Sequence, residues 1–218
     1  MAAFRMAAVL GDYYHKPEAQ RAAIESVAGG LGAEVEVFLD PLGVPWDSLS
    51  RWAVLIMARE GRVAPAVSKD VWFTDAHEQA VSAFVGAGGA LVALHAGLSL
   101  YGHDGVYGRT THGSFINHPV EHPDFHIRPT GAVHQITRDV KEFPIRDEMY
   151  FVRVDSAETT ILMESWSPDY GSSAAAWAHQ VGKGRVFCFT PGHREEVLAS
   201  AAYLTVLNNG MRWAAGVT

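Results

Sequence analysis

The stretch from Gly89 to Gly97, Gly-Ala-Leu-Val-Ala-Leu-His-Ala-Gly, constrains the fold more than any other part of the chain. Its apolar run has neither a helical nor an alternating period, which is typical of a central parallel strand covered on both faces. Ala96 and Gly97 allow a sharp turn, which is expected to lift His95 above the carboxyl edge of the sheet. Nucleophile-elbow enzymes carry a Ser or Cys at such a corner. The imidazole therefore indicates a functional site, but one for different chemistry.

The rest of the first half alternates strand and helix patterns. The predicted elements are a strand at 4–10, a helix at 18–27 begun by Pro17, strands at 34–38 and 52–57, and a helix at 75–85 capped by Thr74. Such alternation predicts a parallel sheet with helices on both faces.

The second half begins with a segment, 102–143, that is rich in His, Gly, Pro and Thr. We expect an ordered loop region there, with short strand-like pieces at 125–128 and 133–136. Later strands are predicted at 149–154, 159–163, 174–179 and 185–190, followed by a helix at 195–207 that runs on towards Trp213. The last two strands should form a hairpin. No linker interrupts the pattern, so residues 1–218 are predicted to form a single domain.

Composition narrows the class of protein. The formal net charge is −7 with no basic stripe, so a nucleic-acid partner is not expected. The single cysteine, Cys188, lies in an apolar strand and is expected to be a buried structural thiol in a reducing compartment. We see neither a signal-peptide pattern nor an apolar run long enough to span a bilayer. These features predict a cytoplasmic protein without a membrane partner.

Histidines are concentrated in one part of the chain. Seven of the eleven lie between positions 95 and 134, which favours a shared role over independent solvated side chains. The spacing of His118, His122 and His126 superficially resembles a helical metal motif, but Pro119 and Pro123 exclude a regular helix. A metal such as zinc or manganese, held by loop histidines and a carboxylate, stays open as an alternative.

Three further segments carry candidate residues. His193 follows a buried strand and so lies at the same carboxyl edge as His95; the glutamates after it orient the imidazole or cap the next helix. Glu148 and Tyr150 enter a later strand. The first strand–helix loop, with Asp12, Tyr14 and His15, lacks phosphate-loop glycines and instead suits the faces and hydroxyls of a sugar.

The sequence lacks the motifs of two common reaction classes. After the first strand there is no G-x-G-x-x-G and no P-loop, and the elbow has no Cys or Ser. Dinucleotide-dependent redox chemistry and acyl-enzyme chemistry are therefore disfavoured.

Several motifs together resemble the trehalose-utilisation (ThuA-like) family over nearly the whole chain. They are the strand that ends at His95, Gly-Ser-Phe-Ile-Asn-His118-Pro, Ile145-Arg-Asp-Glu148-Met-Tyr150, the segment from Trp177 to Phe187, Pro191-Gly-His193, and Leu207-Asn-Asn-Gly-Met-Arg-Trp213. The resemblance implies a three-layer α/β fold, flavodoxin-like and related to class I glutamine amidotransferases, with a mostly parallel central sheet. In those amidotransferases the position of His95 carries the nucleophilic Cys and that of His193 its base. Thioester-dependent glutamine hydrolysis is therefore not expected here.

The resemblance also implies carbohydrate metabolism on 3-keto sugars made by a partner sugar dehydrogenase. A His or Glu base would remove the proton next to the ketone, leading to isomerisation or to elimination and hydrolysis. We expect His95 and His193 to act as base and acid or to polarise the carbonyl, and Glu148 and His118 to assist. The expected sugar-binding residues are Asp12, Tyr14, His15, Tyr150 and Arg194.

Alternatives remain open at this point. One is a non-catalytic sugar-binding or regulatory module, and another is a metal-dependent hydrolase. The sequence requires no cofactor; a divalent metal such as zinc would be held by His95, His118, Glu148 and His193. The aromatic surface is weakly consistent with a homo-oligomer.

Overall fold

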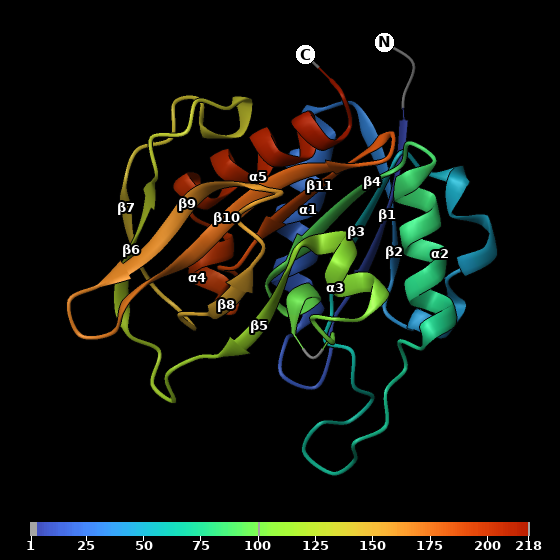
Figure 1. Ribbon diagram of the computed structural model, residues 1–218, viewed down its shortest axis with the longest axis horizontal. Coiled ribbons are helices and arrows are strands. Elements are labelled where there is room, and N and C mark those ends of the chain that lie inside the picture. Colours follow the sequence, from blue (N-terminus) through green and yellow to red (C-terminus); the bar gives the residue numbers. More distant parts are fainter. Residues whose placement is uncertain (1–3, 100, 218) are drawn as a thin grey trace.

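A nine-stranded sheet forms the centre of the computed structural model, which describes residues 4–99 and 101–217 (Figure 1). The strands lie in the order β2 (Ala33–Phe38), β1 (Phe4–Leu10), β3 (Val54–Ala58), β4 (Ala90–Leu94), β11 (Gly184–Phe189), β10 (Gly171–Val181), β9 (Thr160–Ser167), β6 (Asp124–Pro129) and β7 (Phe143–Arg146). Neighbours from β2 to β11 are parallel, and neighbours from β11 to β7 are antiparallel. A separate pair, β5 (Gly113–Asn117) with β8 (Phe151–Val154), is antiparallel.

Helices cover both faces of the parallel half (Figure 1). On one face lie α1 (Pro17–Gly30), α4 (Glu195–Leu198) and α5 (Ala201–Ala214), and on the other lie α2 (Asp75–Gly86) and α3 (Val106–Thr111). Successive side chains of β1 supply both apolar clusters, because alternate residues of a strand point to opposite faces: Met6, Ala8 and Leu10 to one, Ala7 and Val9 to the other. The α/β three-layer fold expected from the sequence is confirmed.

Short 3-10 turns complete the connections: η1 (Pro41–Gly43), η2 (Trp46–Arg51), η3 (His95–Leu98) and η4 (Gln135–Thr137). The turn η3 continues β4 directly, and Gly97 is required there. A Cβ at this position would lie 1.9 Å from the backbone oxygen of Met57. The close approach of η3 to β3 fixes the corner at which His95 stands.

Helix starts agree with the sequence signals. Pro17 occupies the first turn of α1, where its missing N–H costs no hydrogen bond. Thr74 precedes α2, and its backbone N–H donates to Nδ1 of His77 at 3.0 Å, one half of a capping box. The predicted hairpin is also present, as β10 and β11 pair antiparallel. Cys188 is buried, as expected.

Three predictions for the second half are wrong. Residues 133–136 are not a strand but loop and η4, held to α5 by the side-chain amide of Asn209, which donates to the Ile136 oxygen. The helix predicted at 195–207 is two helices: α4 ends at Leu198, and Ser200 begins a second helix as its N-cap, where its Oγ accepts the N–H of Tyr203 in α5. The strand predicted at 149–154 begins only at Phe151. In addition, α3, β5 and β7 form where loop was expected.

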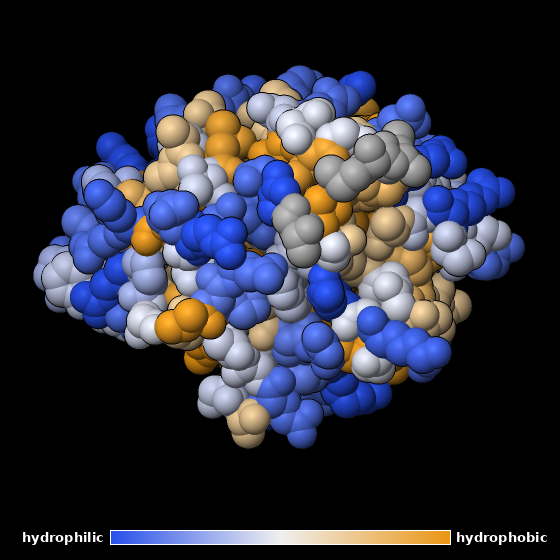
Figure 2. Space-filling model, turned by 90° about the horizontal axis from the view of Figure 1, so that it is seen from above, coloured by the Kyte–Doolittle hydropathy of each residue, from blue (hydrophilic) through white to orange (hydrophobic). Residues whose placement is uncertain are grey.

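The amino edge of the sheet lies opposite the carboxyl edge at which His95 stands. The start of β1 and the end of α5 lie at the amino edge (Figure 1). Seen from this side, the surface is mostly hydrophilic, with apolar atoms gathered in one area near its middle (Figure 2). No helix in residues 4–99 and 101–217 is long and apolar enough to cross a membrane.

Candidate functional site

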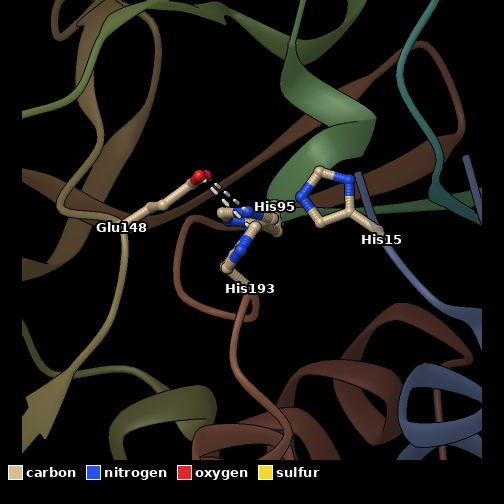
Figure 3. Close-up of side chains that lie close together, drawn as sticks. All are labelled: His15, His95, Glu148 and His193. Carbon is tan, nitrogen blue, oxygen red and sulfur yellow. Dashed lines mark ion pairs between the residues drawn. The ribbon is translucent and has the colours of Figure 1, made fainter. Parts of the chain in front are cut away.

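The candidate site lies at the carboxyl edge of the parallel strands, where α/β folds bind ligands. His15 comes from the loop after β1, His95 follows β4, and His193 follows β11. Glu148 comes from the connection between β7 and β8 and reaches across to these imidazoles (Figure 3). The four side chains are separated by 178 positions at most in the sequence (193 − 15) and meet in one place.

His95 occupies the corner that the sequence predicts. Its φ is +44°, a left-handed conformation that costs a residue with a Cβ about 1–2 kcal/mol. Its ring is buried and stacks on Tyr150, with 4.2 Å between ring centroids. Nδ1 lies 2.7 Å from the backbone oxygen of Thr190, which can only accept, so Nδ1 carries the proton. Nε2 therefore faces Glu148 Oε2, at 3.3 Å.

His15 is held from behind by Asp12. The ring Nδ1 lies 2.7 Å from Asp12 Oδ1, and the Asp12 side chain is 1% exposed. Asp12 also accepts the backbone N–H groups of Tyr14, His15 and Glu60. Burial raises the pKa of Asp12, but its hydrogen bond to His15 and these other contacts outweigh burial and lower it. Asp12 therefore orients His15 as an ionised carboxylate.

Asp147 shapes the loop that carries His193. Its buried carboxylate accepts the backbone N–H groups of Gly192 (2.7 Å), His193 (3.2 Å) and Arg194 (3.0 Å). Burial raises the pKa of Asp147 overall, although His95 and the three N–H groups act in the other direction. The loop presents His193 Nδ1 to Glu148 Oε1, at 3.3 Å.

Glu148 is the centre of the cluster. Besides His95 and His193, the Nε2 atoms of His118 and His122 lie 3.6 and 3.7 Å from its Oε1. Burial raises the pKa of Glu148, but the adjacent imidazoles, His95 foremost, outweigh burial and lower it to about 2. The pKa of His193 is lowered to about 4, mainly by burial and despite Glu148. For His95, burial lowers the pKa and the carboxylates raise it, with a net increase.

Four of these groups have the composition of a metal site. One ligand atom from each of His15, His95, Glu148 and His193 lies within 4.8 Å of the others. Imidazole and carboxylate are ligands that zinc and other first-row metals accept. His118 and His122 stand farther out, with side chains 30% and 27% exposed.

An open cleft leads to the cluster, with a volume of about 240 Å³. Its walls include Tyr14, His122 and Arg194, together with His15 and His193. Tyr14 is half exposed. Aromatic faces and cationic or polar groups around such a volume suit a polar small molecule.

Most of the residues predicted from the sequence meet here. His95, His193, Glu148 and His118 converge, and Tyr14 and Arg194 line the cleft. Among the residues predicted to bind sugar, Asp12 and Tyr150 lie in the interior, behind His15 and beside His95 respectively.

Two contributors were not predicted. Asp147 is only the acidic neighbour of Glu148 in the sequence, and nothing local shows that it accepts three N–H groups of a distant loop. His122 belongs to the histidine-rich segment, where Pro119 and Pro123 exclude a regular helix but give no signal for contact with Glu148.

The chain is thus an α/β protein whose mixed sheet carries an imidazole–carboxylate cluster at the carboxyl edge of its parallel strands, the edge at which open α/β folds bind ligands. A family model for trehalose utilisation (ThuA) matches residues 7–214, and the chain belongs to this family. No sequence among the curated proteins is similar enough to match.

Solved structures show the same fold at low sequence identity. A putative ThuA-like protein from Parabacteroides merdae has a TM-score of 0.78 and 14% identity, covering 99% of this chain and 91% of that one. A similar protein from Bacteroides uniformis has a TM-score of 0.75 and 17% identity, covering 98% and 93%. A beta-galactosidase from Bacillus circulans is similar over 98% of this chain but only 31% of its own, with a TM-score of 0.62 and 12% identity.

Proposed function

We propose that this chain is a carbohydrate-metabolism enzyme that acts on keto-sugars or keto-glycosides, such as 3-keto-disaccharides, by removing a proton next to the carbonyl. The observation that carries the proposal is the contact of one carboxylate, Glu148, with four imidazoles beside a polar cleft. Membership of a family described by trehalose utilisation supports a sugar as the substrate.

The cluster fits proton transfer better than acyl transfer. The elbow carries His95, so no side-chain nucleophile for an acyl-enzyme stands at this corner. Imidazoles exchange protons near neutral pH, and Glu148 stabilises the positive charge that an imidazole gains when it accepts one. The hydrogen bond from the His95 ring to Thr190 and the bond from the His193 backbone N–H to Asp147 hold the ring of one and the backbone of the other in place, which limits reorganisation during the reaction.

A base takes the proton from the carbon beside the ketone, and the C–H electron pair forms an enediolate with negative charge on the former carbonyl oxygen. Addition of a proton to the former carbonyl carbon, with loss of the proton from the hydroxyl on the neighbouring carbon, gives an isomer. In the elimination, the enediolate instead re-forms the ketone, a C=C bond forms, and the glycosidic C–O bond breaks, with the leaving oxygen taking a proton from the acid. Addition of water across that C=C bond completes hydrolysis. His95 and His193 act as base and acid or polarise the carbonyl, and Glu148 and His118 assist them.

Sugar recognition falls to the walls of the cleft. Tyr14 offers an aromatic face and a hydroxyl, and Arg194, which also lines the cleft, offers a guanidinium. Arg194 is already oriented by Glu196, at 3.1 Å. A keto-sugar held between these groups presents its carbonyl towards the imidazoles. In the same proposal, a sugar dehydrogenase supplies the oxidised substrate.

The test is NMR spectroscopy of 3-keto-disaccharides and their unoxidised parents with the protein in D₂O, with and without divalent metal. We expect deuterium at the carbon next to the ketone and a new product, and no change in the unoxidised sugars. His95→Ala and His193→Ala should abolish both signals. His126→Ala is the matched control, because His126 is also paired with a glutamate, Glu142 at 2.7 Å, but on β6.

Two results would overturn the proposal. Exchange and turnover at wild-type rates in both His95→Ala and His193→Ala would remove the cluster from the reaction. Calorimetric binding of keto-sugars without deuterium exchange or product would instead favour a sugar-binding or regulatory module.

A further inference from the structure

We infer that His15, His95, His193 and Glu148 form a binding site for one divalent first-row transition metal, such as zinc. This inference concerns the ion at the proposed active site and does not depend on the identity of the sugar. It assigns His15 a place that the sequence gave to His118 among the metal ligands.

The first argument is that three buried ring nitrogens lie around one point without a full set of hydrogen bonds: Nε2 of His15, Nε2 of His95 and Nδ1 of His193. Nε2 of His15 has no partner, and the other two have only the Glu148 carboxylate, at 3.3 Å each. The residues His15 and His95 are only 6% and 1% exposed. A buried polar atom left unpaired costs about 1–3 kcal/mol, and one carboxylate at this distance is a weak partner for two rings, so a further common partner is expected at this point.

The second argument is the state of each ring. His95 Nδ1 donates to the Thr190 carbonyl, and His15 Nδ1 donates to the Asp12 carboxylate. In the neutral imidazole, the opposite nitrogen of each ring then carries a lone pair aimed into the cluster. Metal-binding histidines almost always have such a carbonyl or carboxylate behind them, because it fixes the tautomer and raises the basicity of the ligand.

The third argument is distance. Two ligand atoms at about 2.1 Å from a zinc ion are at most about 4.2 Å apart. The ligand atoms of this set lie within 4.8 Å of one another. In a tetrahedral shell the same atoms are about 3.4 Å apart, so side-chain shifts of up to roughly 0.8 Å close the shell. The rings of His95 and His193 each lie 4.9 Å from the ring of His15, so His15 is a neighbour of both.

The same criteria place His118 outside the shell. Its Nδ1 contacts the oxygen of Pro119 at 2.7 Å, and its Nε2 reaches only Glu148, at 3.6 Å. No buried acceptor of another element orients the ring, and its side chain is 30% exposed. When an ion is bound, the ring nitrogens of His95 and His193 are ligands and no longer exchange protons, so these residues take the second role proposed for them and polarise the carbonyl through the ion. His118 and His122 then stay free to move a proton at the rim. A bound cation would polarise the ketone of a substrate.

The test is calorimetric titration of the chelator-treated protein with Zn²⁺, Mn²⁺ and Co²⁺, with visible absorption of the Co²⁺ form as a second readout. We expect one ion per chain. His15→Gln and His95→Gln should each weaken binding at least 100-fold, and Asp12→Asn about 10- to 100-fold, the usual loss when a carboxylate behind a ligand is removed. His118→Gln is the matched control and should change affinity less than threefold.

Thermal unfolding of each chelator-treated variant identifies any that fail to fold. If a ligand variant does not fold, its metal affinity cannot be used, and the visible spectrum of Co²⁺-loaded Asp12→Asn then serves as the test of the site. Wild-type protein that binds none of the three ions below millimolar concentration would overturn the inference. So would a large loss in His118→Gln with unchanged binding in His15→Gln. Since no sugar is present, this failure is distinct from failure of the keto-sugar reaction, which the deuterium experiment measures separately.

Discussion

At the scale of single residues, His95 is held in a conformation that its own side chain disfavours. Its φ of +44° is left-handed, and a Cβ is unfavourable there. Strain of this kind is found where the surrounding structure fixes a functional side chain. Here the surroundings are the close contact of Gly97 with Met57 and the hydrogen bond from His95 to Thr190.

We therefore expect His95→Gly to be more stable than His95→Ala by about 1 kcal/mol, because glycine tolerates positive φ. Both variants lack the imidazole, so the difference between their free energies of unfolding reports the backbone strain at position 95 alone. Urea unfolding of the chelator-treated proteins measures it. His193 has no positive φ, so the same pair of substitutions there should have the opposite order. The same order at both positions would contradict the strain at His95.

Asp147 acts through backbone groups. Its carboxylate accepts three N–H groups from residues 192–194, and an asparagine amide cannot accept all of them. Asp147→Asn should lower the free energy of unfolding by about 1–3 kcal/mol, the cost of leaving a buried donor unpaired.

A positioning role adds a kinetic signature. Because the loop carries His193, kcat for a keto-sugar should fall about 10- to 100-fold, since small misplacements of a catalytic group are costly, while KM changes only a few-fold. Glu25→Gln, on the exposed face of α1, is the control and should leave kcat unchanged. A loss of stability with unchanged kcat would make Asp147 purely structural.

Local patterns predicted some of these residues and not others. His95 and His193 each follow a buried strand, so their edge position could be predicted from sequence. The pairing of Asp12 with His15 could not, because three residues in a loop can adopt many arrangements. The choice of His15 over His118 as a neighbour of His95 depends on how two loops fold in three dimensions.

At the scale of elements, α3 could not be predicted from its own sequence, because the helix depends on contacts with β10. The segment 106–111, Val-Tyr-Gly-Arg-Thr-Thr, combines β-branched residues with glycine and has low helix propensity. Tertiary contacts stabilise the helix despite this low propensity. Trp177 Nε1 donates to the oxygen of Thr111, and His179 Nε2 contacts the oxygen of Thr110, both from β10. Packing against the sheet therefore determines this helix.

His179 makes that contact sensitive to pH. Burial lowers its pKa from 6.5 to about 4, despite its bond to Thr110. In the unfolded chain the ring takes a proton as pH falls through 6.5, whereas in the folded chain it stays neutral to about pH 4. The unfolded state binds more protons in this window, so stability falls as pH drops, by roughly 3 kcal/mol at most from this group.

The measurement is urea unfolding of wild type and His179→Gln at intervals between pH 7 and pH 4. Glutamine keeps a donor for Thr110 but does not titrate. The variant should lose less stability than wild type as the pH falls through this window. Parallel curves for the two proteins would show that His179 does not contribute.

At the scale of the whole molecule, the site unites both halves of the sheet. The parallel half supplies His15, His95 and His193, and Glu148 follows β7, the last strand of the antiparallel half. Strand–helix alternation predicts most of the parallel half from sequence because β1 to β4, which are successive in the chain, are also neighbours in the sheet; β11 is the exception. The antiparallel half has irregular loops and β6 between β9 and β7, so the arrival of Glu148 depends on long-range pairing.

This arrangement couples metal binding to global stability. The four ligand residues span positions 15 to 193, so the unfolded chain offers no preformed site. An ion at 100 times its dissociation constant should add about 2.7 kcal/mol. For a chain of this length that corresponds to an increase in Tm of roughly 5–10 °C.

Calorimetric scans of the chelated protein with and without Zn²⁺ measure that increase. His15→Gln should remove it, whereas His118→Gln should keep it, since His118 lies outside the proposed shell. An equal increase in all three proteins would place the stabilising ion elsewhere. An increase that disappears in His15→Gln and persists in His118→Gln would show that the loop after β1 holds the stabilising ion.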